Sequence, residues 1–421
     1  MNASSGRSTF FKQSSWMMLA VTTSGVFMWA VHVPAMRKMP GTEYAMFAAL
    51  LQVLNLMMIP AVALQTVFAK QTAGALEPDQ KRQLRGSVRG LISVTSILWG
   101  IGFCAIYLLR DQILPSLKIT DPAALWITVL TCLPLLWLPI LEGVLQGNQN
   151  FLWLGCTNLV KGFGRFAAIL VTVVLLGGFA TAGVTAVFVG TLTASFIAVW
   201  QTRDCWTGAS DPIEWKPWLR HVLPLTLGLG ASQFMFAADM IFVQNVFDDG
   251  RAPYAAAGTI ARGIVAFTGP LAMVMFPKIV RSAARSESTN LLTQALVATA
   301  VLGAGAALGC TLFPRLPFIL LKPEFLPIAP LLPWFAWCMW PLTLSNILVS
   351  NLLARSQFGV VPWLVVIALA YGVTLLLLRG SFGQTGESLP ELKKVVQILG
   401  GFNLLTLLVC LGFTRRTNGS D

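Results

Sequence analysis

The chain has 421 residues, of which 56% are hydrophobic and only 11% carry a charge, and its mean hydropathy is +0.72. A soluble domain needs about twice that share of charged residues, so the composition excludes a soluble globular protein. In a soluble chain, the net charge of +12 would indicate nucleic-acid binding. Here most Lys and Arg residues lie in short segments between apolar stretches, as in membrane proteins, and no nucleic acid is expected as a partner.

Apolar stretches long enough to cross a bilayer, about 20 residues each, recur along the whole chain. They predict an all-α polytopic membrane protein with about twelve transmembrane helices. The predicted spans are 15–36, 43–68, 87–110, 122–147, 151–177, 180–202, 218–247, 252–280, 290–313, 325–354, 358–378 and 394–414.

The basic residues predict how these spans are oriented. If the N-terminus is cytoplasmic, the cytoplasmic segments hold sixteen Lys and Arg residues and the opposite side holds ten. Cytoplasmic loops of membrane proteins carry an excess of Lys and Arg. We therefore expect both termini to be cytoplasmic.

A repeated pattern divides the chain into two halves. Tyr44 and Pro60 are sixteen residues apart, as are Tyr254 and Pro270, and the two pairs are offset by 210 residues. Internal repeats of this kind indicate duplicated units, and two units of six spans enter the membrane in the same direction. We expect two pseudo-symmetric six-helix lobes, with the N-terminal lobe at 1–206, an interfacial linker at 207–220 and the C-terminal lobe at 221–421.

The expected linker contains tryptophans beside cations, as in Trp215-Lys216 and Trp218 followed by Arg220. Aromatic rings and cations gather where a membrane meets water. The linker is expected either to lie as an amphipathic segment on the cytoplasmic surface or to form an ordinary loop.

Five ionisable residues remain inside the predicted spans. Each would cost about 2.5–3.5 kcal/mol if it faced lipid at the middle of the bilayer. We therefore expect them to face a hydrated interior or one another. They are Glu142, Lys161, Arg165, Asp239 and Arg262.

Lys161 and Arg165 lie four residues apart in Lys-Gly-Phe-Gly-Arg and should share one face of their helix. Gly162 and Gly164 would let a neighbouring helix or a ligand come close. This pattern predicts an anion-binding site. In the alternative interpretation the cations reach the membrane surface or pair with Glu142, which could neutralise only one of them.

Asp239 and Arg262 are predicted at the same depth of adjacent spans, where a salt bridge is expected. The pair could be a static structural contact. It could also be a gate that opens when a substrate phosphate competes for Arg262 or when Asp239 takes up a proton. Both interpretations stay open at this stage.

The sequence contains no nucleotide-binding loop, nucleophile constellation or spacing of metal ligands. We therefore expect neither an enzyme nor a bound cofactor or metal.

The chain resembles the polysaccharide-exporter branch of the multidrug/oligosaccharidyl-lipid/polysaccharide (MOP) exporter superfamily, which includes the O-antigen lipid-linked oligosaccharide flippases. The residues that carry the resemblance are Gly41-Thr-Glu-Tyr44, Asp239-Met-Ile-Phe-Val, Tyr254-Ala-Ala-Ala and Phe276-Pro277-Lys278. The lipid II flippase of peptidoglycan synthesis is a more distant relative, because the first span here lacks an arginine–aspartate pair.

The resemblance implies two six-helix bundles similar to those of MATE transporters, with alternating access to a central cavity. The implied substrate is an undecaprenyl-pyrophosphate-linked oligosaccharide of polysaccharide or lipopolysaccharide biosynthesis, moved across the inner (cytoplasmic) membrane. The implied partners are the polysaccharide polymerase and glycosyltransferases of that pathway, with a proton or sodium ion as coupling ion.

Three functions remain to be compared. In a flippase, Lys161, Arg165 and Arg262 would bind the pyrophosphate, while Asp239 and Glu142 would serve in coupling or gating. A cation-coupled multidrug antiporter of the same fold is the alternative, although cationic drugs favour an acidic cavity and this set holds three cations against two carboxylates. A membrane scaffold without transport would leave five buried charges unexplained.

Overall fold

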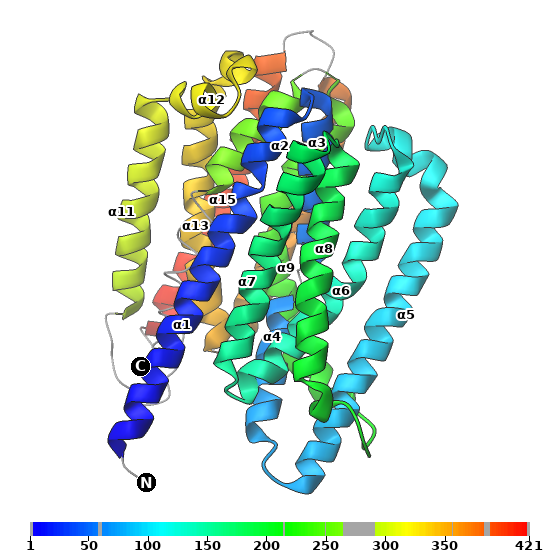
Figure 1. Cartoon of the computed structure of the whole chain (residues 1–421). Helices are drawn as coiled ribbons and strands as arrows, with labels where there is room; N and C mark the ends of the chain where they lie inside the picture. Colours follow the sequence, from blue (N-terminus) through cyan, green and yellow to red (C-terminus); the bar gives the residue numbers. More distant parts are fainter. Residues whose placement is uncertain are drawn as a thin grey trace. The chain divides into compact units, whose positions relative to one another are not determined.

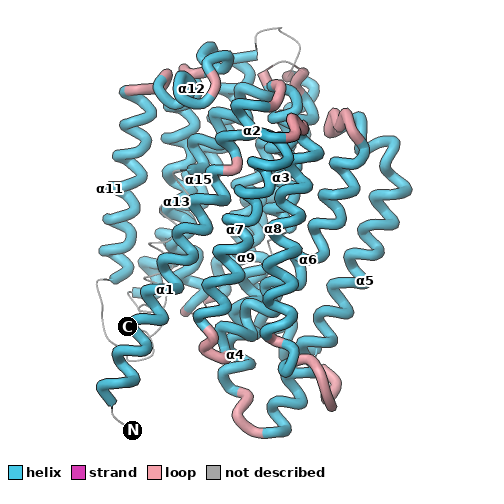
Figure 2. Tube along the Cα trace, in the orientation of Figure 1, coloured by secondary structure: helices cyan, strands magenta, loops and turns pink. Residues whose placement is uncertain are grey.

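The structure is a computed structural model, and it describes residues 3–57, 61–213, 215–248, 250–263, 291–355, 357–382 and 388–418. These residues form helices joined by short loops, and no strand occurs among them (Figures 1 and 2). A helix satisfies its own backbone N–H and C=O groups, which a chain inside hydrocarbon requires. The predicted all-α polytopic fold is confirmed.

Ten helical segments within the described residues are long and apolar enough to cross a membrane. Twelve were expected from the sequence, and the difference has two sources. Within the predicted span 43–68, the described residues belong to α3 (Gly41–Met57) and α4 (Ala61–Gly74), and residues 58–60 between them lie outside the described residues. The predicted span 252–280 lies largely outside the described residues, which end there with the helical stretch 251–263.

The N-terminal compact unit comprises Met1–Ala35 and Met57–Thr226. Within it α7 packs on both α1 and α8, and α6 packs on both α4 and α8. Besides α4 and the start of α2, its helices are α1 (Ala3–Ala30), α5 (Pro78–Ser116), α6 (Pro122–Gly147), α7 (Phe151–Ile169), the π-helical continuation η1 (Leu170–Leu175), α8 (Ala180–Gln201) and η2 (Arg203–Cys205).

The C-terminal compact unit comprises Met36–Leu56 and Leu227–Asp421. Within it α13 packs on α11 and α15, and α15 also packs on α14. Besides α3, its helices are α9 (Trp215–Val246, which begins in the other unit), 251–263, α11 (Leu291–Leu312), α12 (Leu316–Leu321), η3 (Pro323–Ile328), α13 (Leu331–Ala354), η4 (Phe358–Val360), α14 (Val361–Leu378), η5 (Arg379–Ser381) and α15 (Ser388–Asn418).

The short helix α2 (His32–Lys38) leads the chain from the first unit into the second, so that α3 packs with the C-terminal residues. The hydroxyl of Tyr44 donates a hydrogen bond to Thr259 Oγ1 at 3.0 Å. Lys322 Nζ donates to the backbone carbonyl of Met39 at 2.9 Å. Residues 36–56 therefore group differently from the expected N-terminal lobe at 1–206, because their packing partners lie more than two hundred residues away in sequence.

The repeated tyrosines share an environment. Tyr44 and Tyr254 are both fully buried in the C-terminal unit, and both hydroxyls donate hydrogen bonds. Pro60, Pro270 and the segment Phe276–Lys278 lie outside the described residues. The duplication of the two halves stays a prediction.

The first part of the expected linker, residues 207–213, forms a loop held on α5. Arg89 donates hydrogen bonds to the carbonyl of Gly208 at 2.7 Å and to the hydroxyl of Ser210 at 3.1 Å. The backbone N–H of Asp211 donates to the carbonyl of Arg82 at 3.2 Å. Helix α9 then begins at Trp215 and continues into the candidate membrane span Val222–Val246. The predicted location of the linker at the membrane surface stays a prediction.

Gly86 of α5 makes this loop contact possible, because a methyl group there would overlap the carbonyl oxygen of Asp211. We expect Gly86→Ala to lower the free energy of unfolding by about 1–3 kcal/mol and to release the loop. Thermal unfolding and the rate of tryptic cleavage after Arg203 would measure both effects. Gly102 on the same helix has nothing within 4 Å, so Gly102→Ala is the control and should be neutral or slightly stabilising. Unchanged cleavage in Gly86→Ala would contradict this account of the loop.

Candidate functional site

The first pair of predicted site residues lies on α7. Asn150 caps this helix by accepting a hydrogen bond from the backbone N–H of Trp153 at 3.4 Å. Lys161 and Arg165 follow one helical turn apart and share one face, as their spacing predicts. Lys161 Nζ lies 3.3 Å from Glu142 Oε1 of α6, and the two side chains are only 10% and 7% exposed. Glu142 therefore neutralises Lys161.

Arg165 has a different environment. Its Nη2 donates a hydrogen bond to Thr191 Oγ1 of α8 at 3.0 Å, and its Nε is buried without a hydrogen-bond partner. Among the described residues, no carboxylate lies within ion-pair distance of this guanidinium. The cluster of Glu142, Lys161 and Arg165 consequently carries one net positive charge, located at Arg165.

Small residues bring the neighbouring helices close to this part of α7. A methyl group at Gly162 would lie 2.6 Å from the carbonyl oxygen of Ser24 in α1, and one at Gly190 of α8 would lie 2.6 Å from the backbone nitrogen of Arg165. Phe27 of α1 packs against Phe163 with ring centroids 5.3 Å apart. The close approach predicted at Gly162 is therefore made by a neighbouring helix, which fixes the backbone that carries both cations.

The second pair lies in the C-terminal unit, and the expected salt bridge is confirmed. Arg262 Nη2 donates to both carboxylate oxygens of Asp239, at 2.6 and 2.7 Å, and its Nε donates to the carbonyl of Phe236 at 2.9 Å. The hydroxyl of Tyr254 donates to Asp239 Oδ2 at 2.8 Å. Asp239 is fully buried and Arg262 is 5% exposed.

Aromatic rings enclose this ion pair. The guanidinium carbon of Arg262 lies 5.4 Å from the ring centroid of Phe236 and 5.7 Å from that of Phe335. Such contacts stabilise a cation that has lost its water. The carboxylate of Asp239 accepts three hydrogen bonds from protein groups, so a coupling ion would compete with these contacts.

Two contributors were not predicted from the sequence. Thr191 is one of several threonines on α8, and nothing in the sequence distinguishes it as a partner of Arg165. Tyr254 was identified as part of the repeat and of the family resemblance, and its hydrogen bond to Asp239 follows from the fold. The described residues contain no group of three His, Cys, Asp or Glu side chains arranged to hold a metal ion.

No family model and no curated protein sequence matches the chain. Several solved structures do match. A multidrug resistance transporter of the MATE family, within the MOP superfamily and in an inward-facing conformation, is 12% identical with a TM-score of 0.71; the alignment covers 96% of this chain and 98% of that one. The lipid II flippase MurJ in an inward closed conformation is 13% identical with a TM-score of 0.74, over 95% of this chain and 87% of that one.

A MOP superfamily transporter from Pyrococcus furiosus, for which a binding pocket of reverse polarity is described, is 12% identical with a TM-score of 0.65, over 96% of this chain and 94% of that one. These structural alignments show a shared fold. Because the sequence identities are so low, they do not show which substrate this protein moves. The chain is a multi-pass membrane protein with the fold of the MATE and MOP superfamily transporters and of the lipid II flippase.

Proposed function

We propose that this protein is a flippase that moves a lipid-linked, undecaprenyl-pyrophosphate-bearing oligosaccharide across the inner membrane by alternating access, as the O-antigen flippases do. The observation that carries the proposal is the guanidinium of Arg165. It lies inside a span, donates one hydrogen bond to Thr191, and has no carboxylate partner among the described residues. A cation left uncompensated in a membrane is costly, and an anionic substrate group would compensate it.

A pyrophosphate suits this cation chemically. Guanidinium groups form two parallel hydrogen bonds to phosphate oxygens, which are shorter and stronger than bonds between neutral groups. The buried Nε of Arg165 still has a hydrogen to donate. Movement of the diphosphate out of a negative interior would gain about 2.3 kcal/mol per charge per 100 mV, so the membrane potential favours export.

Lys161 and Arg262 contribute differently in this proposal, because each already has a carboxylate partner. Lys161 would bind the pyrophosphate when it exchanges Glu142 for phosphate oxygens. Arg262 would do so only if it left Asp239, which also holds Tyr254. We therefore assign primary binding to Arg165 and secondary binding to Lys161, and we assign Glu142 and Asp239 to gating.

The alternative function is a cation-coupled multidrug antiporter, since MATE multidrug transporters share the fold. Such an antiporter needs a carboxylate that can exchange a drug for a proton or sodium ion. Of the carboxylates predicted inside the spans, Glu142 is paired with Lys161 and Asp239 accepts three protein hydrogen bonds. These contacts favour the flippase.

The test is the substitution Arg165→Gln in the full-length protein. A hydrogen bond to a charged group contributes about 1.5–3 kcal/mol, so affinity for undecaprenyl pyrophosphate should fall about 10- to 100-fold, while affinity for uncharged undecaprenol should not change. In proteoliposomes, transbilayer movement of a fluorescent undecaprenyl-pyrophosphate oligosaccharide should fall at least tenfold. Chemical quenching of the outer leaflet measures that movement.

The matched control is Arg203→Gln. Arg203 is an exposed arginine of the same unit, and its guanidinium stacks on Trp200. It should leave both measurements unchanged. Arg165→Lys should retain part of the activity, because the charge remains while the paired hydrogen bonds are lost. Movement at the normal rate in Arg165→Gln would overturn the proposed site, and export of cationic dyes by the purified protein would favour the antiporter.

A further inference from the structure

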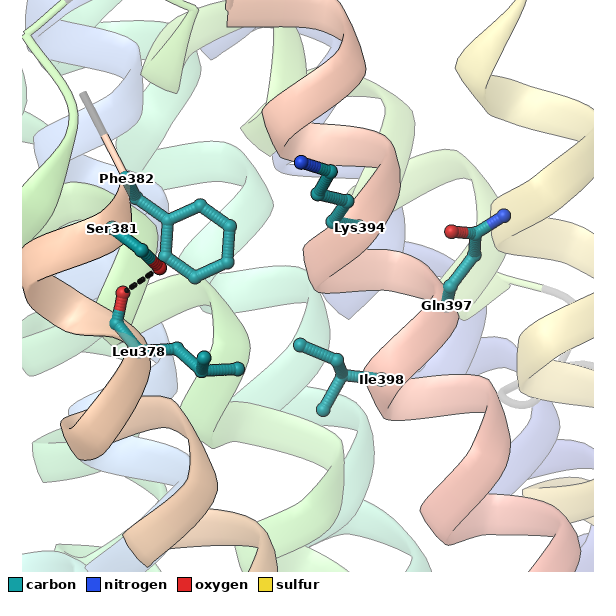
Figure 3. A pocket seen from close by; sticks show the side chains of 6 residues that line it. All are labelled: Leu378, Ser381, Phe382, Lys394, Gln397 and Ile398. Atoms are coloured by element: carbon teal, nitrogen blue, oxygen red, sulfur yellow. Dashed lines mark hydrogen bonds between the residues drawn. The ribbon is translucent and has the colours of Figure 1, made fainter. Parts of the chain in front are cut away.

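A cavity of about 490 Å³ lies in the C-terminal unit where the end of α14 faces α15. Leu378, Ser381 and Phe382 line it from the side of α14, and Lys394, Gln397 and Ile398 line it from α15. In Figure 3 the side chains of Leu378, Phe382, Lys394 and Ile398 point into the same gap from the two sides. The cavity thus combines three apolar side chains with two neutral polar side chains and one cation.

The apolar wall is fixed in place before any ligand arrives. Phe382 packs edge-on against Phe242 of α9, with ring centroids 5.9 Å apart, and against Phe247 at 5.8 Å. The hydroxyl of Ser381 is used locally, since it donates to the carbonyl of Leu378 at 2.7 Å. Small-molecule sites usually combine apolar side chains with a small number of polar groups that orient the ligand.

Helix α14, which carries one wall of the cavity, also has a face that is apolar and exposed. Along α14, Leu369 is 63% exposed, Val373 52%, Leu376 67% and Leu377 79%. In a soluble protein such a face would promote aggregation, but on a transmembrane helix it contacts acyl chains. An occupant of the cavity can therefore continue along α14 as a hydrocarbon chain.

The charge in the cavity comes from Lys394. This side chain is exposed, and none of the described residues that line the cavity is acidic. Glu391, one turn earlier on α15, is 4% exposed and is not part of the lining. The cavity therefore attracts an anion.

The residues beside Lys394 are of the types that gather at a membrane surface. Its neighbour Lys393 lies 4.1 Å from the ring centroid of Trp334, near the start of α13. Tryptophan and lysine gather at the level of the lipid headgroups, and a lysine near a helix end extends its ammonium group to that level. We therefore expect Lys394 to lie at the level of the lipid phosphates.

We propose that this cavity binds an anionic phospholipid, whose phosphate pairs with Lys394 and whose acyl chain lies against Leu378 and the exposed face of α14. The leaflet is the one next to the connection between α14 and α15, which the predicted orientation makes the outer leaflet. The site is separate from the cation pair on α7 and does not depend on the substrate that the protein transports.

The experiment measures lipid binding to the full-length protein by native mass spectrometry, with phosphatidylglycerol as the probe. Attraction of an anionic lipid surface is worth about 1 kcal/mol per cation, so Lys394→Gln should weaken binding about fivefold. Leu378→Trp should weaken it similarly by filling the cavity without changing the charge. Lys393→Gln is the matched control, because it removes the adjacent lysine that stacks on Trp334 instead of lining the cavity.

Weaker phosphatidylglycerol binding in Lys394→Gln and Leu378→Trp, with normal binding in Lys393→Gln, would support the site. An equal loss of phosphatidylglycerol binding in Lys393→Gln would show that the lipid is attracted by surface charge in general, and it would overturn the proposed site. Displacement of the lipid by millimolar inorganic phosphate would assign the cavity to a soluble anion instead, and equal binding of phosphatidylcholine would remove the role of charge. If Leu378→Trp does not fold, Ile398→Trp tests the same space from α15.

Discussion

Replacing Asp239 with asparagine is expected to lower the free energy of unfolding by about 3–5 kcal/mol, because the substitution leaves a buried guanidinium without its counter-charge. Arg262 is 5% exposed, and its remaining strong contact would be the carbonyl of Phe236. Asparagine has nearly the same size as aspartate, so the substitution leaves no cavity. The loss of free energy of unfolding therefore measures the effect of the missing charge. Tryptophan fluorescence during thermal unfolding of the purified protein measures the effect.

Two further variants test whether the loss of stability comes from the buried charge or whether the loss of any ion pair destabilises this protein. Asp79→Asn breaks the ion pair between Asp79 and Arg82, whose side chains are 75% and 48% exposed, and should cost less than about 1 kcal/mol. The double variant Asp239→Asn with Arg262→Gln should recover part of the stability, because no charge is then left unpaired. Normal stability of Asp239→Asn would show that the pair opens readily and would favour its use as a gate.

The sequence predicted the helices well because the constraint behind them is local. About 20 apolar residues are needed to cross the hydrocarbon, and such runs are visible without any knowledge of tertiary contacts. The packing of the helices was less accessible. Residues 36–56 join the C-terminal unit through contacts such as Tyr44 to Thr259 and Lys322 to Met39, and an apolar helix carries no local signal of which helix it will pack against.

In the candidate site, too, some features could be predicted from the sequence and others depend on how the helices pack. The Asp239–Arg262 pair was predictable, since two opposite charges at one depth of adjacent spans have few other ways to avoid lipid. For Glu142 and the two cations on α7, the sequence indicated that at most one cation could be neutralised by Glu142, but it did not say whether or which. Glu142 pairs with Lys161, and Arg165 instead meets Thr191 through the close packing of α8 at Gly190. That choice depends on side-chain geometry between helices.

Glu142→Gln is expected to change stability and ligand binding in opposite directions. Without its carboxylate partner, the buried ammonium of Lys161 should lower the free energy of unfolding by roughly 3–5 kcal/mol. The same change gives α7 two uncompensated cations one turn apart, so undecaprenyl pyrophosphate should bind more tightly than to the unaltered protein. A ligand that binds only the folded state stabilises it in proportion to its affinity. The ligand should therefore raise the unfolding temperature more in Glu142→Gln than in the unaltered protein.

The double variant Glu142→Gln with Lys161→Gln serves as the control, since it removes both charges while keeping two side chains of similar length. It should recover much of the stability and lose the gain in affinity, because Arg165 alone would then face the pyrophosphate. Uncharged undecaprenol should shift the unfolding temperature equally in all variants. If undecaprenyl pyrophosphate shifted the unfolding temperature equally in Glu142→Gln and in the unaltered protein, Lys161 would not reach the phosphate. Its ion pair with Glu142 would then be a structural contact between α6 and α7.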